Sequence, residues 1–156
     1  METAAIRIWN RQRRVKIDSE AVGLFCGALA ESLCLSGRAF SVIFVGIMTM
    51  RGLNRKWRNK DSATDVLSFG YGDEIIDGIP FLGEIVIAPE IALRQAAEYG
   101  VPVEHEVRKL IAHGALHLMG YDHETDGGEM IRMQHRVSRR RFFTARPVIV
   151  RHEVKL

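Results

Sequence analysis

Three of the six histidines in this 156-residue chain fall between His113 and His123. His113 and His117 are four residues apart, which on a helix places both imidazoles on one face, one turn apart. Gly120 can end that helix and turn the chain, so that His123 approaches the same point from a loop. A catalytic zinc ion takes three neutral nitrogens of this kind and keeps a fourth position for water or substrate. The spacing therefore predicts one Zn2+ per chain, bound by His113, His117 and His123.

The same spacing is also found in the zinc helix of the metzincin proteases. Those enzymes carry a glutamate directly after the first histidine, where it serves as general base. Here that position is Gly114, which has no side chain, so peptide hydrolysis is only a minor alternative. A zinc ion on three histidines has no ligand carboxylate to neutralise its charge, and it can polarise a phosphoryl oxygen. The site therefore suits an anionic substrate such as a phosphodiester.

Basic residues are unevenly distributed in the chain, which has a net charge of +3 and a pI near 9.1. Residues 51–60 hold five cations and residues 136–151 hold six arginines, in both cases without an acid. Such runs are most often solvated faces, but beside a metal site they favour a polyanionic partner, nucleic acid first. The sequence shows no signal peptide and no apolar run of membrane-spanning length. Cys26 and Cys34 are expected to be buried free thiols in a reducing cytosol, so we expect a cytoplasmic protein.

Hydrophobic periodicity and turn residues predict strands and helices that alternate irregularly. The expected strands are residues 5–10 at an edge of the sheet, 39–45, 64–69 and 81–87, with a glycine-rich loop over 70–80. Five helices are expected: from the N-cap Asp18 to about Leu35, from the cap Thr49 over 50–57 with Leu53 and Trp57 inward, 89–99, the histidine helix after Pro102, and a last helix capped by Asp126. This pattern predicts an α+β fold, a small mixed four-stranded sheet covered by about five helices. One domain is expected over residues 1–143, followed by a C-terminal basic tail over 144–156.

Two further segments accompany the histidine stretch: residues 53–61, LNRKWRNKD, and residues 64–69, TDVLSF. Together the three segments closely resemble the bacterial YbeY endoribonucleases. Residues 82–87 and Gln95-Ala96 fit the same pattern, so the likeness covers roughly residues 6–140.

The resemblance implies a zinc-dependent, single-strand-specific endoribonuclease with its metal at the floor of a basic cleft. It implies action in 16S ribosomal RNA 3′-end maturation and in ribosome quality control. The implied partners are single-stranded ribosomal RNA precursor and proteins of the ribosome or its small subunit, with neither DNA nor a membrane.

His113, His117 and His123 match the metal ligands of this family, and Arg58 matches its functional arginine. Arg58 and His113 are therefore the expected catalytic residues. A guanidinium can hold a phosphate bidentately and stabilise the charge that grows during cleavage. Without the resemblance, Arg58 would be interpreted as a solvated arginine on a basic helix.

The chain departs from the family pattern at three places within residues 6–140, none of them a metal ligand, and its arginine-rich segment after Arg140 exceeds the usual end of the family. Gly70 stands where proline is usual, Glu84 stands where aspartate is usual, and residues 45–47 lack the acidic residues common after that strand.

Two other functions remain open: a metal-stapled RNA-binding assembly factor without turnover, and a zinc hydrolase of another ester or amide.

Three more residues could orient ligands or water beside the metal: Asp65, Ser68 and Asp122. Capping and turn roles explain each of them equally well. The sequence leaves open whether water or a ribose 2′-hydroxyl attacks the phosphate, and it does not define the oligomeric state.

Overall fold

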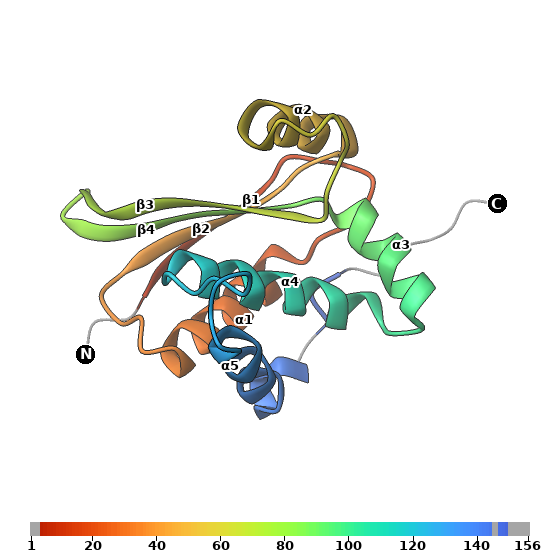
Figure 1. Ribbon diagram of the computed structural model, residues 1–156. Coiled ribbons are helices and arrows are strands. Elements are labelled where there is room, and N and C mark those ends of the chain that lie inside the picture. The colour runs from red at the N-terminus through yellow and green to blue at the C-terminus, as the bar shows by residue number, and fades with distance from the viewer. Residues whose placement is uncertain (1–3, 145–146, 150–156) are drawn as a thin grey trace.

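Four strands form one mixed sheet in the computed structural model, which describes residues 4–144 and 147–149 (Figure 1). The strands are β1 (Ala5–Asn10), β2 (Ala39–Phe44), β3 (Val66–Ile76) and β4 (Ile79–Ile87). Their order is β1-β2-β4-β3, with β1, β2 and β4 parallel and β3 antiparallel to β4. The predicted mixed sheet is therefore confirmed, and so is the place of the first strand at its edge.

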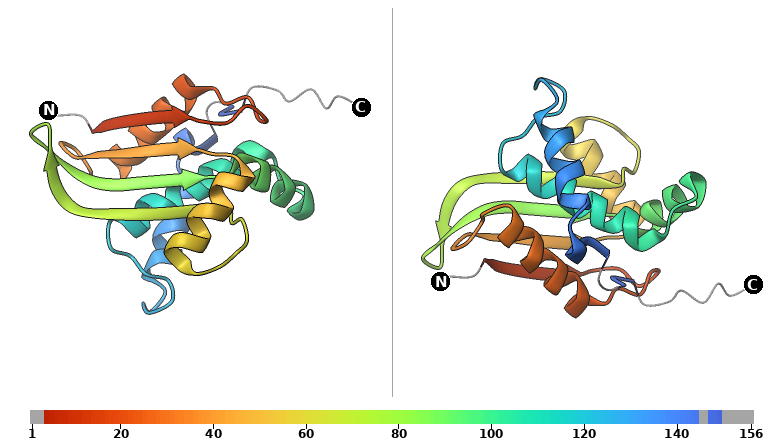
Figure 2. Two further views of the ribbon diagram at one scale, coloured as in Figure 1. Left: turned by 90° about the horizontal axis from the view of Figure 1, so that it is seen from above. Right: turned by 90° about the horizontal axis from the view of Figure 1, so that it is seen from below.

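Five α-helices accompany this sheet, as predicted, and a short 3-10 helix follows them. They are α1 (Ser19–Ser32), α2 (Ile47–Arg58), α3 (Pro89–Tyr99), α4 (Val103–Leu118), α5 (Glu129–Ser138) and η1 (Arg141–Thr144). Of these, α3 and α5 pack mainly on α4. The helices α1, α4 and α5 lie below the sheet in Figure 1, whereas α2 lies above it; Figure 2 shows the two faces in turn. The sheet thus has one thickly covered face and one face that carries little besides α2.

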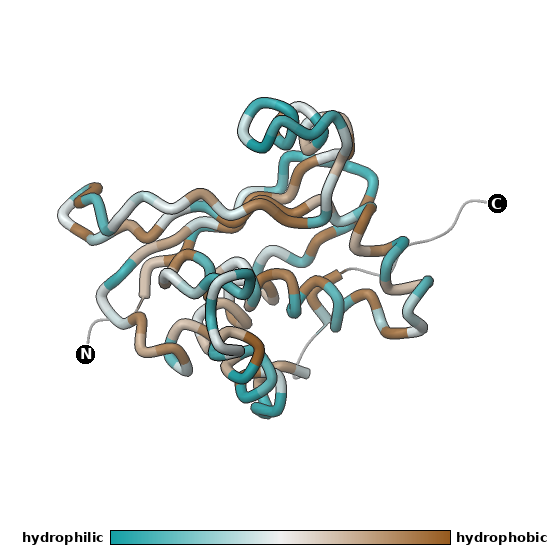
Figure 3. The backbone as a smooth tube through the Cα atoms, in the orientation of Figure 1, coloured by the Kyte–Doolittle hydropathy of each residue, from teal (hydrophilic) through white to brown (hydrophobic). Residues whose placement is uncertain are grey.

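The main core lies between the sheet and the helices α1 and α4. Asp18 caps α1 as predicted, because its Oδ1 accepts a hydrogen bond of 3.0 Å from the Ala21 amide. The apolar stripe of α1 and the inward side chains of the strands are buried there, among them Val22, Leu29, Phe40 and Phe44. In Figure 3, hydrophobic residues are concentrated along the strands, and the helices alternate between hydrophobic and hydrophilic residues. This core fixes α4, the helix that carries two of the three histidines, against the sheet.

The predicted loop over residues 70–80 is wrong, because β3 and β4 extend through it as a long hairpin. Only Asp77 and Gly78 form the turn, and both have positive φ angles, 51° and 77°. An Asp-Gly pair with two positive φ angles is the tightest favoured connection between antiparallel strands. The glycines and acids of this segment therefore mark an exposed hairpin rather than a loop.

The helix α2 begins earlier than predicted and faces the sheet differently. It starts at Ile47 after the N-cap Gly46, so Thr49 lies inside its first turn and is not its cap. Met50 and Asn54 are its buried residues, and Asn54 Nδ2 donates a 2.8 Å hydrogen bond to the Ser62 carbonyl. The prediction that Trp57 faces inward is wrong: it is 60% exposed, because the buried residues of α2 end at Asn54 and Trp57 lies beyond them in the last turn.

The described part of the predicted C-terminal tail packs on the core. Val148 and Ile149 are buried, and the Asp18 amide donates a 3.0 Å hydrogen bond to the Val148 carbonyl. Residues 145–146 and 150–156 lie outside the described residues, so the domain boundary at residue 143 stays a prediction.

Cys26 is buried as expected, and burial raises the pKa of its thiol. Cys34 is exposed, contrary to expectation, because it lies in the left-handed turn after α1.

Within residues 4–144 and 147–149, none of the helices has the length and apolar character needed to cross a lipid bilayer.

Candidate metal centre and its cavity

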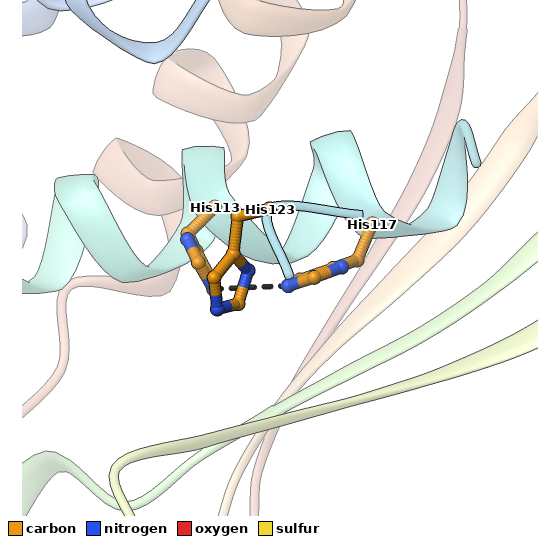
Figure 4. A group of neighbouring side chains, drawn as sticks. All are labelled: His113, His117 and His123. Carbon is orange, nitrogen blue, oxygen red and sulfur yellow. Dashed lines mark hydrogen bonds between the residues drawn. The ribbon is translucent and has the colours of Figure 1, made fainter. Parts of the chain in front are cut away.

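The three histidines of the motif converge at the C-terminal end of α4 (Figure 4). His113 and His117 project from consecutive turns of the helix, and their Nε2 atoms are 3.0 Å apart. His123 comes from the loop after Gly120, and its ring centroid lies 5.4 Å from that of His113 and 5.3 Å from that of His117. One ligand atom from each histidine lies within 4.8 Å of the other two. The structure therefore brings together the group that the spacing predicted, and this group could hold a metal ion.

Hydrogen bonds on the far side of two rings fix the proton away from this point. His117 Nδ1 lies 3.0 Å from the Tyr121 carbonyl oxygen, which can only accept, so Nδ1 carries the hydrogen. His113 Nδ1 lies 3.3 Å from Oε1 of Gln134 on α5, which orients that ring in the same way. Each Nε2 then presents a lone pair toward the convergence point. Histidine ligands of metals are commonly held by such a second hydrogen bond.

The contact between these two Nε2 atoms supports a cation site. With the hydrogens on Nδ1, the two Nε2 lone pairs face each other 3.0 Å apart, an arrangement that a shared cation would stabilise. Tetrahedral zinc with Zn–N bonds of about 2.0–2.1 Å separates its nitrogen ligands by roughly 3.3 Å. The donor set and the separation of these two nitrogens are therefore compatible with a metal ion such as zinc.

Burial lowers the pKa of His113, and the nearby rings of His117 and His123 lower it further. The hydrogen bond with Gln134 and the carboxylate of Asp65 act in the opposite direction but do not cancel this effect. A depressed pKa keeps the imidazole neutral near pH 7, which is the form that binds a metal.

Gly114 lets α4 approach the sheet closely enough to place the histidines. A Cβ atom at this position would lie 2.6 Å from Ile85 Cγ2 and 3.1 Å from Ser68 Oγ. The Ser68 hydroxyl donates a 3.4 Å hydrogen bond to the Gly114 carbonyl, which ties β3 to α4. The residue after the first histidine thus points into the sheet, where the glutamate of a metzincin helix could not be accommodated.

A cavity of about 730 Å3 opens in front of the histidines. Its wall includes Arg58 from the end of α2 and Lys60 from the following loop. Asp65, directly before β3, and Ser68 on β3 line it, together with Asp122 from the loop after α4. The structure therefore places Arg58 in the same cavity as the three histidines, although the two segments are more than fifty residues apart in the chain.

The acids of this wall differ in how they are held. Asp122 Oδ1 accepts a 3.0 Å hydrogen bond from the Glu124 amide, which is the local turn role weighed for it from the sequence. Asp65 Oδ1 accepts from the Val66 amide at 2.7 Å. Its other oxygen lies 3.2 Å from the side-chain amide of Gln95, with the Gln95 nitrogen oriented to donate. Asp65 is thus fixed by contacts on both oxygens, beside His113.

Sequence reasoning missed three groups at this site: Lys60, Gln134 and the carbonyl of Tyr121. Lys60 belongs to the basic run and to the segment that carries the family resemblance, but the sequence assigns it no role of its own at the site. Gln134 is 21 residues from His113 and reaches it only because α5 packs on α4, so no local pattern could indicate it. The Tyr121 carbonyl is a backbone group, although the glycine before it marks the turn that brings it back toward His117.

The chain matches the family model described as Endoribonuclease YbeY over residues 7–140. It belongs to the YbeY endoribonuclease family. Relatives named Endoribonuclease YbeY include one from Thermodesulfovibrio yellowstonii, 38% identical over 83% of this chain and 91% of its own length. Another, from Alkaliphilus metalliredigens, is 42% identical over 78% of this chain and 84% of its own length.

A solved structure supports the fold independently. The solution structure of a protein from Thermotoga maritima is similar, with a TM-score of 0.60 and 30% identity over 85% of each chain. The resemblance stated from the sequence is therefore confirmed, as is membership in a class of RNA-cleaving hydrolases.

Proposed function

We propose that this chain is a zinc-dependent endoribonuclease that cleaves single-stranded RNA in the cavity in front of His113, His117 and His123. The observation that carries the proposal is the presence of three converging imidazoles and the cations Arg58 and Lys60 in one cavity. Zinc bound there supplies a Lewis acid that lowers the pKa of water and polarises a phosphoryl oxygen. Family membership and the names of the relatives support RNA as the substrate.

The side chains of the cavity divide the remaining work. His113, His117 and His123 hold the metal, with His113 and His117 kept in the correct tautomer by Gln134 and Tyr121. Arg58 binds non-bridging oxygens of the scissile phosphate and offsets the negative charge that grows as the bond breaks. Asp65, fixed on both oxygens, orients the attacking group at the cavity wall. We thus assign Arg58 and His113 as catalytic residues.

Cleavage of a single-stranded oligoribonucleotide by purified protein tests this function. Zinc-loaded protein should cut the RNA, and thorough chelation should stop cleavage until zinc is restored. His117→Ala should lose both zinc, measured by elemental analysis, and cleavage, which excludes a contaminating ribonuclease. RNA binding without metal-dependent cleavage would contradict the proposal and would favour an assembly factor without turnover.

Arg58→Ala should keep one zinc per chain and lose cleavage by at least about 100-fold, because charge stabilisation by one donor is commonly worth that much. Arg58→Lys should recover only part of the rate, since an ammonium cannot bind a phosphate bidentately. Equal cleavage rates for Arg58→Ala and the unaltered protein would remove Arg58 from the mechanism.

We further propose that the substrate is the precursor of 16S ribosomal RNA, cut near its 3′ end in the cytoplasm, with a role in ribosome quality control and with ribosomal small-subunit proteins as partners. Sequencing of ribosomal RNA ends in cells that lack the protein tests this assignment. Extended 3′ ends should accumulate and disappear when the gene is restored, but not when the His117→Ala form is supplied. Normal ends in the deletion strain would contradict it.

A further inference from the structure

The upper face of the sheet presents side chains that the histidine cavity does not use. Strand register places Arg7, Ser41, Glu84 and Phe69 in one row across the four strands. Helices α1, α4 and α5 cover the opposite face, so this face is left to α2 (Figure 2). Two large aromatic side chains, Trp57 and Tyr71, are exposed on this side of the molecule.

A groove of about 860 Å3 runs between α2 and this face. Its walls and floor include Leu53 and Trp57 from α2 and Phe69 and Tyr71 from β3. Trp57 is 60% exposed, and Phe69 supports it in a T-shaped contact with ring centroids 5.9 Å apart. Tyr71 is 38% exposed and rests edge-on against Phe81 at 4.9 Å. Two large aromatic rings are thus held in place by other aromatic rings while part of their surface stays accessible.

The groove and the histidine cavity meet at one residue. Ser68 lines both hollows, at the point where β3 forms the edge of the sheet. Trp57 lines the groove, and the next residue, Arg58, lines the cavity. A strand bound at the histidines can therefore continue around the β3 edge into the groove.

The charges of the groove define what fits it. Arg11 lines one side, and Lys56 Nζ lies 5.1 Å from the centre of the Trp57 ring. Glu84 lies on the floor. Burial raises the pKa of the Tyr71 hydroxyl, and the nearby Glu84 carboxylate raises it further. A floor carboxylate repels phosphate but accepts hydrogen bonds from the amino groups of bases. The groove therefore suits a polyanion that turns flat, amino-bearing rings inward and keeps its charges at the rim.

We propose that this groove is a base-stacking subsite, in which Trp57 and Tyr71 bind nucleobases of the single-stranded RNA whose phosphate lies in the histidine cavity. The proposal rests on the proposed function for the identity of the polymer. Stacking of bases on aromatic side chains binds single strands without requiring a particular sequence. A duplex hides the faces of its bases, so the groove also gives a physical reason for a preference for single strands.

Equilibrium binding of two probes tests the subsite. One probe is a single-stranded oligoribonucleotide about ten nucleotides long, and the other is its abasic counterpart with the same backbone. Binding is measured in the presence of a chelator, so that it does not depend on turnover. Trp57→Ala and Tyr71→Ala should each weaken binding of the normal probe by about 5- to 100-fold and leave binding of the abasic probe unchanged. Trp57→Phe should restore most of the loss.

Two controls separate stacking from general damage. Met48 is on the same helix and is 72% exposed, but it does not line the groove, so Met48→Ala should bind both probes like the unaltered protein. The chain has two tryptophans, so in a Trp9→Phe background the remaining indole reports on the groove alone, and its fluorescence should be quenched by the normal probe only. Thermal melting of every variant verifies that it is folded.

The outcomes distinguish this subsite from the proposed function. If cleavage depends on zinc and His117 but Trp57→Ala and Tyr71→Ala bind RNA normally, the subsite is overturned and the groove is left for a protein partner. If the abasic probe binds the unaltered protein as tightly as the normal probe, stacking is likewise overturned. If no metal-dependent cleavage occurs but binding requires bases, Trp57 and Tyr71, the subsite stands and the proposed function fails.

Discussion

Gly114 shows how one residue controls both packing and chemistry at this site. It lies between two ligand positions of the helix and at the closest approach of α4 to the sheet. A Cβ atom there would meet Ile85 at 2.6 Å, which is well inside van der Waals contact. The absence of a side chain at Gly114 therefore has two effects. It removes the general base, and it allows the close approach of α4 to the sheet that positions His113 and His117.

Gly114→Ala should destabilise the protein by about 1–3 kcal/mol, the usual cost of forcing an extra carbon into a packed core. Because Ile85 and Ser68 can yield only by moving the helix, zinc affinity should fall as well. Urea unfolding and a competitive zinc titration measure the two effects.

Gly27 provides the matched control, since it lies inside α1, is exposed and has no atom within 4 Å of its would-be Cβ. Gly27→Ala should stabilise the protein by about 0.5–1 kcal/mol, the difference in helix propensity. A Gly114→Ala variant as stable as the Gly27→Ala variant would show that the close packing is not a constraint.

At the scale of single residues, sequence reasoning succeeds where the relevant geometry is local. His113 and His117 share a helical face because of their spacing, and Gly120 has the positive φ angle of 96° that turns the chain toward His123. It fails for Gln134, whose contact with His113 depends on how two helices pack. It also fails for Trp57, which lies in the last turn of α2 and is exposed rather than inward-facing.

Among the elements, the loop between α4 and α5 decides whether His123 reaches the other two ligands. Asp126 holds the far end of this loop, because its Oδ1 accepts from the Gly128 amide at 2.8 Å and its Oδ2 from the Met130 amide at 3.0 Å. These two backbone hydrogen bonds lower the pKa of its carboxyl group. Asp126 thus accepts a hydrogen bond from the first turn of α5, but the N-cap residue is Gly128, two positions after the cap predicted from the sequence.

Asp126→Asn should lower the melting temperature near pH 7, because an amide has one oxygen and leaves one of the two backbone N–H groups without its acceptor. A carboxyl group whose pKa is depressed on folding stabilises the protein above its unfolded pKa, about 3.9. That stabilisation is lost as the pH falls through the lower folded value. Melting curves of the two proteins should therefore differ at neutral pH and approach each other in acid. A constant difference at all pH values would refute the role of the charge.

The hairpin of β3 and β4 shows a limit of reading elements from composition. Glycines and acids between residues 70 and 80 indicate a loop, whereas strand pairing continues on both sides of the Asp77-Gly78 turn. The information was present in the sequence, since Asp-Gly is a strong hairpin signal. The glycines and acids of this segment nevertheless favour a loop, because the hairpin is exposed and needs few apolar residues. The strands and helices nearer the core were predictable because their apolar periodicity is complete.

At the scale of the whole molecule, the metal centre joins α4, the loop after it and, through Gln134, α5. A ligand that binds the folded state but not the unfolded chain stabilises the protein by mass action, by about 2.7 kcal/mol at a concentration 100 times its Kd. Zinc should therefore raise the melting temperature of the metal-free protein in a concentration-dependent way. His117→Ala should abolish this shift, and an equal shift in that variant would place the zinc elsewhere.

The distribution of charge over the molecule makes a last distinction among the cations of α2 and the loop after it. Arg51 is paired with Asp61 through two contacts of 2.9 and 3.1 Å, so its charge is already compensated. Over residues 4–144 and 147–149, Arg58 and Lys60 have no acidic partner within ion-pair distance, and both line the histidine cavity. The basic run over residues 51–60 therefore contains a cation whose charge is paired with an acid and cations whose charge faces the histidine cavity.

Each cation that contacts a phosphate of single-stranded RNA adds about 0.7 to the slope of log affinity against log salt concentration. Arg58→Ala and Lys60→Ala should each lower this slope by about 0.7 when RNA binding is titrated in metal-free protein. Arg51→Ala removes the same charge from the same helix but should leave the slope nearly unchanged, because its partner is Asp61. If all three variants lower the slope equally, RNA senses only the total charge of this end of the molecule, and the cavity does not select its phosphate contacts.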